Sequence, residues 1–291
     1  MSTLVEGRAP TSTAPRRRLI TSPGKFLTWG GMAIFLILLF GVIVSVVVNS
    51  FAGKWFDSWL PTSYSGSWYG TAWSQYDLTQ VVLTTLIVAI VVVALSVLIG
   101  VPASYVLARK KFPGSKLVML LFLLPIMMPP ITYGIPLATL LNYYHLAPGL
   151  TGVILANLVP SVPFVVLTMT PFIEQVNPSI ESAARMCGAS TSKLFLRILA
   201  PLLIPGMLAA AVLVLVRTVG MFELTFLTSD SSSNTLVVAL FTAMTGAGIR
   251  AQQSVDAMAV IYMLSMLVLL VIALRFVNPT QLVARVDDSK D

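Results

Sequence analysis

The chain has 291 residues, of which 57% are hydrophobic and only 10% are charged. Ordinary soluble domains carry about 25% charged residues, so the composition excludes a soluble globular protein and indicates an integral membrane protein. The formal net charge is +7, yet the basic residues gather at the ends of apolar segments, which does not favour nucleic-acid binding. With Cys187 and His145 as the only cysteine and histidine, we expect no intramolecular disulfide and no Cys/His metal site.

Six apolar runs dominate the chain, and each reaches the roughly 20 residues that a helix needs to cross a bilayer. They predict an all-α membrane protein with six transmembrane helices, at 27–48, 80–107, 117–141, 151–173, 198–227 and 257–276. Four segments organise the chain: a disordered basic tail (1–26), the first span with an aromatic outer loop (27–79), a five-span core (80–276) that contains a polar loop at 174–197, and a second tail (277–291). No small-residue cleavage site follows the first apolar run, so we expect no cleaved signal peptide.

Positive charge alternates between the connections. Lys and Arg gather in both tails and in two loops, at Arg8, Arg16, Arg17, Arg18, Lys25, Arg109, Lys110, Lys111, Lys116, Arg185, Lys193, Arg197, Arg275, Arg285 and Lys290, whereas the other connections hold only Lys54 and Arg250. By the positive-inside rule, both termini and the two basic loops are cytoplasmic. The first outer loop is rich in Trp and Tyr. It is either an interfacial aromatic belt or a docking surface for a partner or solute.

Prolines interrupt two of the predicted spans. "LLPIMMPPITYGIP" places four prolines around Tyr133 in the third span, and "NLVPSVPF" places Pro160 and Pro163 in the fourth. Each proline removes a backbone donor and frees a carbonyl, which lipid cannot satisfy. These spans are predicted to be broken helices that line a solute pathway, or else tolerated kinks in buried helices.

Tyr133 and three further polar residues of the spans are candidates for the solute pathway. Glu223 is either a pathway carboxylate or an interfacial one, and Arg217 is more typical of a subunit-interface or inter-helix bond than of a solute ligand. On one continuous helix these two would lie about 9 Å apart along the axis and would not pair. Asn157 is more typical of a bond between helices than of a solute ligand.

No catalytic motif is present. The sequence lacks G-x-x-x-x-G-K-[ST], G-x-S-x-G and H-E-x-x-H, and a single histidine gives a serine-type triad little support. The chain is therefore predicted to be non-catalytic, with any nucleotide hydrolysis on a separate chain.

The polar loop contains "NPSIESAARMCGAST", residues 177–191. Asn177 is a good N-cap, Pro178 suits the first helical position and Gly188 suits the position after the helix end. These signals predict a helix of about ten residues with Glu181 and Arg185 on its polar side. Its small apolar stripe consists of Ile180, Ala183, Ala184 and Cys187. Ser190 is predicted to cap a second helix that continues into the fifth span. A short lone helix is marginal in water, so it must dock on another protein or lie along the membrane surface.

At these residues the chain resembles the inner-membrane permease subunits of binding-protein-dependent ABC importers. Their cytoplasmic signature reads Glu-Ala-Ala, three residues, Gly, nine residues, Ile, one residue, Leu-Pro. The matching positions here are Ala183, Ala184, Gly188, Ile198 and Pro201. Ser182 replaces the signature Glu, with Glu181 one position earlier, and Ala200 replaces the Leu.

The resemblance implies a mechanism and a set of partners. In such importers this loop forms a coupling helix that sits in a cleft of a cytoplasmic ATPase subunit, and closure of the ATPase dimer rocks the spans. The residues of this chain that the resemblance implies for ATPase coupling are Glu181, Ala183, Ala184, Gly188, Ile198 and Pro201. It implies a second permease subunit, in this branch a different chain, two ATPase subunits and an extracytoplasmic solute-binding protein, in a bacterial inner membrane. ATP would bind the ATPase subunits, and this chain would hold no cofactor and contact no nucleic acid.

The outer loop and "MFELTFLTSDSSSNTLVVALF" look most like the spermidine/putrescine branch, which favours a polyamine as solute. Another small polar solute, such as a sugar, an opine, a phosphonate or iron, stays open. Outside this family, the alternatives are an ion-driven secondary carrier, which often shows repeated halves with paired broken spans, and a membrane scaffold that transports nothing.

Overall fold

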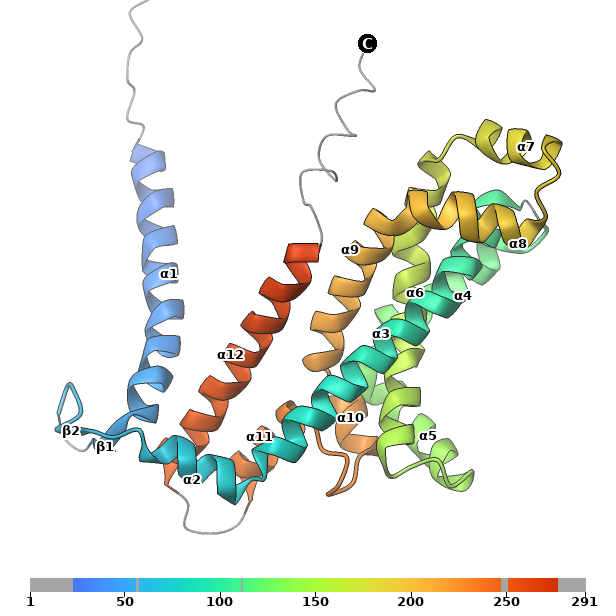
Figure 1. Cartoon of the computed structure of the whole chain (residues 1–291). Coiled ribbons are helices and arrows are strands. Elements are labelled where there is room, and N and C mark those ends of the chain that lie inside the picture. The colour runs from blue at the N-terminus through green and yellow to red at the C-terminus, as the bar shows by residue number, and fades with distance from the viewer. Residues whose placement is uncertain (1–22, 56–57, 111, 247–250, 277–291) are drawn as a thin grey trace, which may run out of the picture. The chain divides into compact units, whose positions relative to one another are not determined.

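Figure 1 shows the computed structural model, which describes residues 23–55, 58–110, 112–246 and 251–276. The chain divides into two compact units, residues 1–45 and 46–291. Of the predicted N-terminal tail only residues 23–26 are described, and they belong to the first helix. The predicted C-terminal tail, Lys111 and Arg250 lie outside the described residues.

The first unit contains most of α1 (Pro23–Ser50). From Leu27 onward this helix is long and apolar enough to cross a membrane, and nearly all of its side chains in the first unit are exposed. Such an apolar, exposed helix is suited to a lipid environment, where only a fully hydrogen-bonded backbone is stable. The last residues of α1, from Val46, belong to the second unit.

The aromatic outer loop has structure of its own, which the all-α prediction missed. A two-stranded antiparallel hairpin, β1 (Ala52–Lys54) and β2 (Ser63–Tyr64), precedes the short helix α2 (Ser67–Gln75). The Trp68 indole donates a hydrogen bond of 2.8 Å to the Ala52 carbonyl, so α2 is tied to the hairpin. Trp59 is 98% exposed, so the loop also presents an aromatic side chain to its surroundings.

Four further long apolar helices lie in the second unit, and their positions confirm the predicted helices to within about five residues, apart from both ends of the fifth. They are α3 (Leu78–Arg109), α6 (Leu150–Gln175), the continuous helix Thr191–Val219 and α12 (Gln252–Phe276). The third of these consists of α8 (Thr191–Leu194), the π-helical turn η1 (Phe195–Leu199) and α9 (Ala200–Val219). Together with α1, five described helices could each span a membrane.

The third predicted span is not one straight helix. It consists of α4 (Ser115–Met127) and α5 (Pro130–Tyr143), bent by 99° relative to each other. Met128 and Pro129 each precede a proline, and their ψ angles of 142° and 132° are extended, as the steric bulk of the following ring requires. A sixth span exists only if this broken pair counts as one.

The fourth predicted span is not broken, although it contains Pro160, Pro163 and Pro171, and the predicted break is therefore wrong. Pro160 and Pro163 are buried, and α6 packs against α3 and α9. We attribute its continuity to this packing, since neighbouring helices can satisfy the carbonyls that proline frees.

The fifth predicted span ends earlier than expected, at Val219 with Gly220 as the C-cap. A separate short helix, α10 (Glu223–Thr228), follows, and then α11 (Leu236–Thr245), which the sequence did not predict. The assumption that Arg217 and Glu223 share one helix is therefore wrong.

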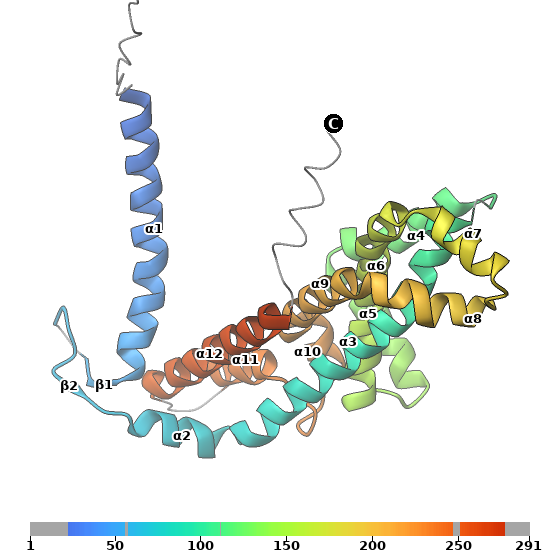
Figure 2. The same ribbon diagram turned by 45° about the horizontal axis from the view of Figure 1, so that its top comes forward.

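The main core lies between α3, α6 and α9, and it includes Val92, Val165, Met169 and Leu203. At Gly100 of α3 an added Cβ would lie 2.7 Å from a Val165 methyl, so only glycine lets α3 and α6 approach this closely. In the turned view of Figure 2, α3 runs from α2 at one end of the second unit to α7 and α8 at the other. This long helix therefore connects the two ends.

Candidate functional site

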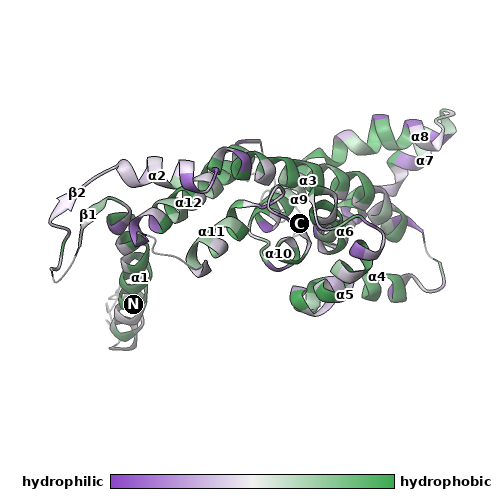
Figure 3. Ribbon diagram, turned by 90° about the horizontal axis from the view of Figure 1, so that it is seen from below, coloured by the Kyte–Doolittle hydropathy of each residue, from purple (hydrophilic) through white to green (hydrophobic). Residues whose placement is uncertain are grey.

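The predicted loop helix is present as α7 (Pro178–Met186). The Asn177 side chain accepts a hydrogen bond of 2.9 Å from the Ser179 amide, and Pro178 occupies the first turn, so both predicted start signals are confirmed. Figure 3 shows polar residues on α7 and α8, in contrast to the hydrophobic α3 and α12.

Gly188 ends α7 as predicted. Its φ of 79° is left-handed, and its amide donates to the Arg185 carbonyl at 2.9 Å while the Ala189 amide donates to the Ala184 carbonyl at 3.0 Å. This pair of bonds is a Schellman motif. The space around a Cβ at Gly188 is open, so the backbone angle alone favours glycine here.

Glu181 was predicted to lie on the polar side of α7, but its side chain is buried, with only 8% exposed. Its two carboxylate oxygens accept separate bonds from α3: Arg109 Nε donates at 2.7 Å to Oε1, and the Tyr105 hydroxyl donates at 2.8 Å to Oε2. A carboxylate held by a guanidinium and a phenol forms charge-assisted bonds, which are stronger than neutral ones. Glu181, Tyr105 and Arg109 thus form an anchor that joins α7 to the end of α3.

Arg109 makes a second contact in this anchor. Its Nη2 donates to the carbonyl of Val176, the residue that ends α6 just before α7 begins. The ring of Tyr105 packs edge-on against Phe195 of η1 at a centroid distance of 5.7 Å. Four segments, α3, the end of α6, α7 and η1, therefore meet at Tyr105 and Arg109.

The apolar stripe of α7 is largely open. Ile180, Ala183 and Cys187 are exposed, whereas Ala184 is half-buried against the main core. Met186 is 84% exposed beside the stripe. An exposed apolar helix side with small residues suits contact with another surface.

The second predicted helix begins at Ser190, whose hydroxyl accepts a hydrogen bond of 3.4 Å from the Lys193 amide. It continues without a break into the fifth span, as predicted, through the π-helical turn η1. Within the signature, Ile198 is half-buried against the core and Pro201 is exposed in the first turn of α9. Single π turns are frequent at functional sites.

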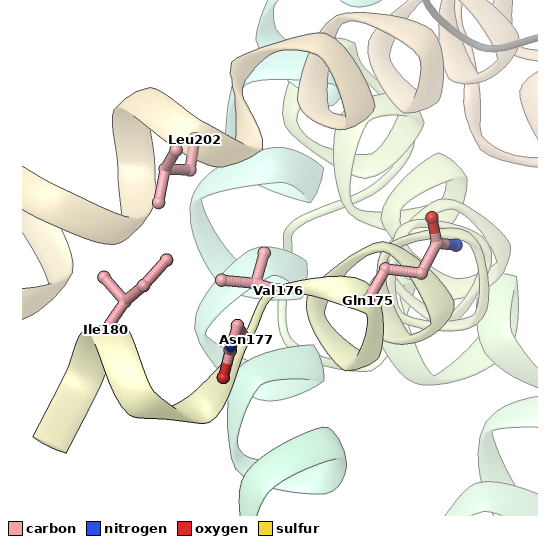
Figure 4. A pocket seen from close by; sticks show the side chains of 5 residues that line it. All are labelled: Gln175, Val176, Asn177, Ile180 and Leu202. Carbon is pink, nitrogen blue, oxygen red and sulfur yellow. The ribbon is translucent and has the colours of Figure 1, made fainter. Parts of the chain in front are cut away.

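Two cavities flank α7. Figure 4 shows one of about 330 Å³, which Ile180 of α7 and Leu202 of α9 border from opposite helices. The other, of about 450 Å³, is lined by two cationic side chains, Lys110 and Arg185, together with Thr191 and Phe195. The surface beside α7 is therefore hollowed at two places. Apolar side chains and the amides of Gln175 and Asn177 line the first cavity, and two cationic side chains border the second.

The candidate pathway residues belong to four helices: Tyr133 to α5, Asn157 to α6, Arg217 to α9 and Glu223 to α10. The Tyr133 hydroxyl is buried without a hydrogen-bond partner in the described part of the chain, and it lies within electrostatic reach of both Arg217 and Glu223. The Arg217 guanidinium sits 5.7 Å from the centroid of the Phe164 ring, a cation–π distance. Tyr133 is thus the candidate that lies near both charged ones.

Asn157, the fourth candidate, is 1% exposed. Its side-chain amide donates to the Thr225 hydroxyl of α10 at 3.2 Å and to the Val153 carbonyl at 2.9 Å. This geometry agrees with a bond between helices, the interpretation that the sequence favoured.

Sequence reasoning missed an aromatic cluster beside Glu223. Phe222, Phe226 and Phe241 lie with ring centroids 4.7 to 5.6 Å apart, and the last two are 47% and 38% exposed. The i, i+4 spacing of Phe222 and Phe226 was a usable signal, because such residues share one helix face. Phe241 belongs to α11, which was not predicted. Among the residues that the structure describes, no group of three or more His, Cys, Asp or Glu could hold a metal ion.

Comparisons with solved structures give the fold. The chain is similar to a chain of a bacterial ABC transporter involved in the import of the acidic polysaccharide alginate, with a TM-score of 0.70 and 15% identity over 87% of this chain and 96% of that one. A chain of a bacterial alginate ABC transporter in complex with an alginate pentasaccharide-bound periplasmic protein matches with a TM-score of 0.65, at 15% identity over 86% of this chain and 91% of that one.

Curated relatives are transport permeases. The trehalose transport system permease protein SugB of Mycobacterium tuberculosis is 32% identical over 42% of this chain and 44% of its own length. A probable molybdenum ABC transporter permease protein of Haloferax volcanii is 32% identical over 51% of this chain and 60% of its own length. The diacetylchitobiose uptake system permease protein NgcG of Streptomyces coelicolor is 28% identical over 61% and 62%. The chain thus spans about half the length of these relatives.

A family match covers more than half of the chain. Residues 100–282, which include α7, the anchor and the signature from Ala183 to Pro201, match the family described as binding-protein-dependent transport system inner membrane component. The chain belongs to this family of binding-protein-dependent transport system inner membrane components.

Proposed function

We propose that this chain is a non-catalytic permease subunit of an ATP-driven importer, and that α7 is the coupling helix that docks on a cytoplasmic ATPase subunit. The observation that carries the proposal is the helix itself: a capped helix of nine residues in register with the family signature, with its apolar stripe open. A helix this short is not stable alone, so an exposed stripe on a fixed helix favours a partner surface.

The proposed docking surface centres on Ala183, Ala184 and Gly188, with Ile198 and Pro201 at the start of the following span. Small residues let another chain approach the helix closely, and the Schellman end fixes where the chain turns away. Ile198 and Pro201 would pass displacement of α7 into α9, since η1 and α9 form one helix with α8.

In the proposed topology, α4 and α5 together form the third of six spans, both termini are cytoplasmic, and the protein lies in a bacterial inner membrane. Residues 1–26 and 277–291 would be cytoplasmic tails, residues 27–79 the first span with the outer loop, and residues 80–276 the transport core. The alternation of Lys and Arg between loops supports this orientation.

The proposed partners are two ATPase subunits, which bind the ATP, a second permease subunit of different sequence, and an extracytoplasmic solute-binding protein. The family description names a binding protein, which supports the last of these. The exposed Trp59 and Tyr64 of the outer loop favour a surface for that protein, and an aromatic belt at the membrane interface is the alternative.

For the solute, we propose a small polar molecule. Glu223 beside three phenylalanine rings would suit a polyamine such as spermidine or putrescine, but Arg217 nearby suits an anion, and the relatives described above transport trehalose, diacetylchitobiose and molybdenum. Polyamine is therefore one candidate among several. A thermal-shift screen of the partner binding protein with spermidine, trehalose, diacetylchitobiose, molybdate and sulfate would separate them, because a ligand that binds only the folded state raises its melting temperature.

Glu223, Arg217 and Tyr133 are the proposed pathway residues. Their side chains are only partly buried, and the unpaired Tyr133 hydroxyl needs a partner that the described chain does not supply. Asn157 already has its bonds inside the chain, and we propose that it holds α6 to α10 beside the pathway.

The experiment that tests the proposal is purification of the tagged chain from its native membrane, followed by transport measurements. We expect a nucleotide-binding subunit to co-purify and uptake into proteoliposomes to require ATP on the ATPase side. Uptake that persists without any ATPase subunit and responds to an ion gradient would contradict the proposal and favour a secondary carrier.

A further inference from the structure

The contacts of Glu181 indicate a role other than the ATPase coupling that the family resemblance implies for this residue. We propose that Glu181 is a positioning residue that locks α7 to α3 and does not contact the ATPase subunit. The inference rests on the proposed function of α7 as a coupling helix. It follows from where the carboxylate points and from what already occupies both of its oxygens.

The Glu181 side chain points toward α3. Glu181 is 8% exposed, whereas the next residue, Ser182, which holds the position of the signature Glu, is exposed. Adjacent positions of a helix differ by about 100° in direction, so a carboxylate moved by one residue turns from the outer to the inner side of α7. The shift by one residue thus exchanges a contact outside the chain for one inside it.

The Glu181 carboxylate contacts two hydrogen-bond donors on α3. Both oxygens accept hydrogen bonds from α3, at 2.7 Å from Arg109 and 2.8 Å from Tyr105. A buried carboxylate with a guanidinium and a phenol is satisfied, and breaking such a pair leaves an uncompensated charge. Glu181 therefore has little exposed surface and no unpaired oxygen with which to bind a partner.

The lock connects α7 to the end of α6 as well as to α3. Arg109 also holds the Val176 carbonyl at the end of α6, so one side chain fixes both the start of the loop and its helix. α3 continues from this point along α6 and α9 to the opposite end of the second unit. A displacement of α7 would be passed to α3 directly through Glu181, in addition to the covalent route through η1 and α9.

Cys187, the single cysteine of the chain, gives a site-specific probe at the end of α7. A spin label on Cys187 of the full-length permease, in nanodiscs without ATPase, reports how firmly α7 is held. Glu181→Gln should raise the ratio of mobile to immobile spin label roughly tenfold, because charge-assisted bonds are lost. Tyr105→Phe removes one bond and keeps the ring against Phe195, so it should give a smaller rise.

Further variants make the test specific. Glu174→Gln removes an exposed carboxylate at the end of α6, and it should leave the spectrum unchanged. Because Glu181 and Arg109 bind each other, their effects on label mobility should not add. The rise in mobility in Glu181→Gln/Arg109→Gln should be smaller than the sum of the rises in the two single variants. Glu181→Asp, which keeps the charge, should recover part of the immobile fraction.

Transport measurements distinguish a positioning role of Glu181 from a general loss of structure in the variant. With the ATPase subunits bound, Glu181→Gln should keep their capture and their ATP hydrolysis but lower the solute imported per ATP severalfold. An unchanged label spectrum in free Glu181→Gln permease, together with weaker capture of the ATPase, would overturn the inference. The spectrum is recorded without ATPase, so it decides for or against the anchor even if wild-type permease captures no ATPase, a result that contradicts only the proposed function.

Discussion

At the α7 end of the second unit, Glu181 and Arg109 neutralise each other and Tyr105 completes the bonding. At the end of α9, Arg217 lies over the Phe164 ring of α6, and neither Arg217 nor Glu223 of α10 has an ion pair among the described residues. The Tyr133 hydroxyl there is buried without a hydrogen bond in the same part of the chain. The first region is closed within the chain and suited to move as one body. The second holds polar groups that need a solute, water or another subunit, as a pathway requires.

Arg109→Ala should have the largest effect and would test whether the α7 end is internally closed. Removing one partner of a buried ion pair costs about 3 kcal/mol, since the remaining carboxylate is buried and uncompensated. We expect the free energy of unfolding to fall by that amount in detergent-denaturation experiments. The matched control is Arg109→Ala/Glu181→Leu, which should recover much of the loss because no unpaired charge is left. Equal losses in the single and double variants would contradict a closed anchor.

Gly188→Val should have the next largest effect and tests whether the end of α7 must be fixed. A β-branched residue at a φ of 79° costs about 1–2 kcal/mol in left-handed backbone, although the space around its side chain is open. We expect ATP-dependent uptake to fall while membrane insertion stays normal. Gly188→Asn is the control, since Asn tolerates this conformation. Equal uptake by wild type and Gly188→Val would argue against the coupling-helix assignment.

Asn157→Leu sharpens the description of the second region. Hydrogen bonds between membrane helices contribute about 0.6 kcal/mol on average, so losing the bond to Thr225 should lower thermal stability slightly. Because Asn157 is closed off inside the chain, the concentration of solute that half-saturates uptake should not change. Glu223→Gln provides the contrast, because the loss of a proposed pathway carboxylate should change that concentration. A large change in Asn157→Leu instead would place Asn157 in contact with solute.

Asp230, in the loop after α10, should give the smallest effect. Hydrogen bonds from Ser232 and Ser233 hold the pKa of its carboxyl below the ordinary value. A depressed pKa in the folded state adds stability above the unfolded pKa of about 3.9, and this is lost as pH falls through the folded pKa. The advantage of wild type over Asp230→Ala in melting temperature should therefore be present at pH 5 and shrink below about pH 4. A difference that does not depend on pH would show that the ionised carboxylate is not responsible.

Local signals in the sequence were enough for the ends of α7. Asn177, Pro178 and Gly188 act through hydrogen bonds and backbone angles within a few residues, so their roles can be predicted without knowing the rest of the fold. The direction of Glu181 could not be predicted in this way, because its partner Arg109 is 72 residues away. Only the packing of α3 beside the loop brings them together.

The prolines also show that local sequence predicts some features of the fold and that others depend on packing. The pair at Pro129 and Pro130 breaks a span because each forces the preceding residue into an extended conformation, whereas Pro160 and Pro163 leave α6 continuous between its neighbours. The sequence located all four prolines but could not tell which of them would break a helix. The cluster of Phe222, Phe226 and Phe241 was missed for a related reason, since it depends on α11 folding back beside α10.

The central claim is that α7 docks on an ATPase subunit, and reaction of Cys187 with a maleimide tests it most directly. Cys187 is exposed at the end of α7, so it should react readily in the permease alone and several times more slowly in the complex with its ATPase. As a control, Ser231→Cys in a Cys187→Ser background places an exposed thiol in the loop after α10, and its rate should be the same in both preparations. Protection of Cys187 alone is the predicted result. Equal rates at Cys187 with and without bound ATPase would contradict the account.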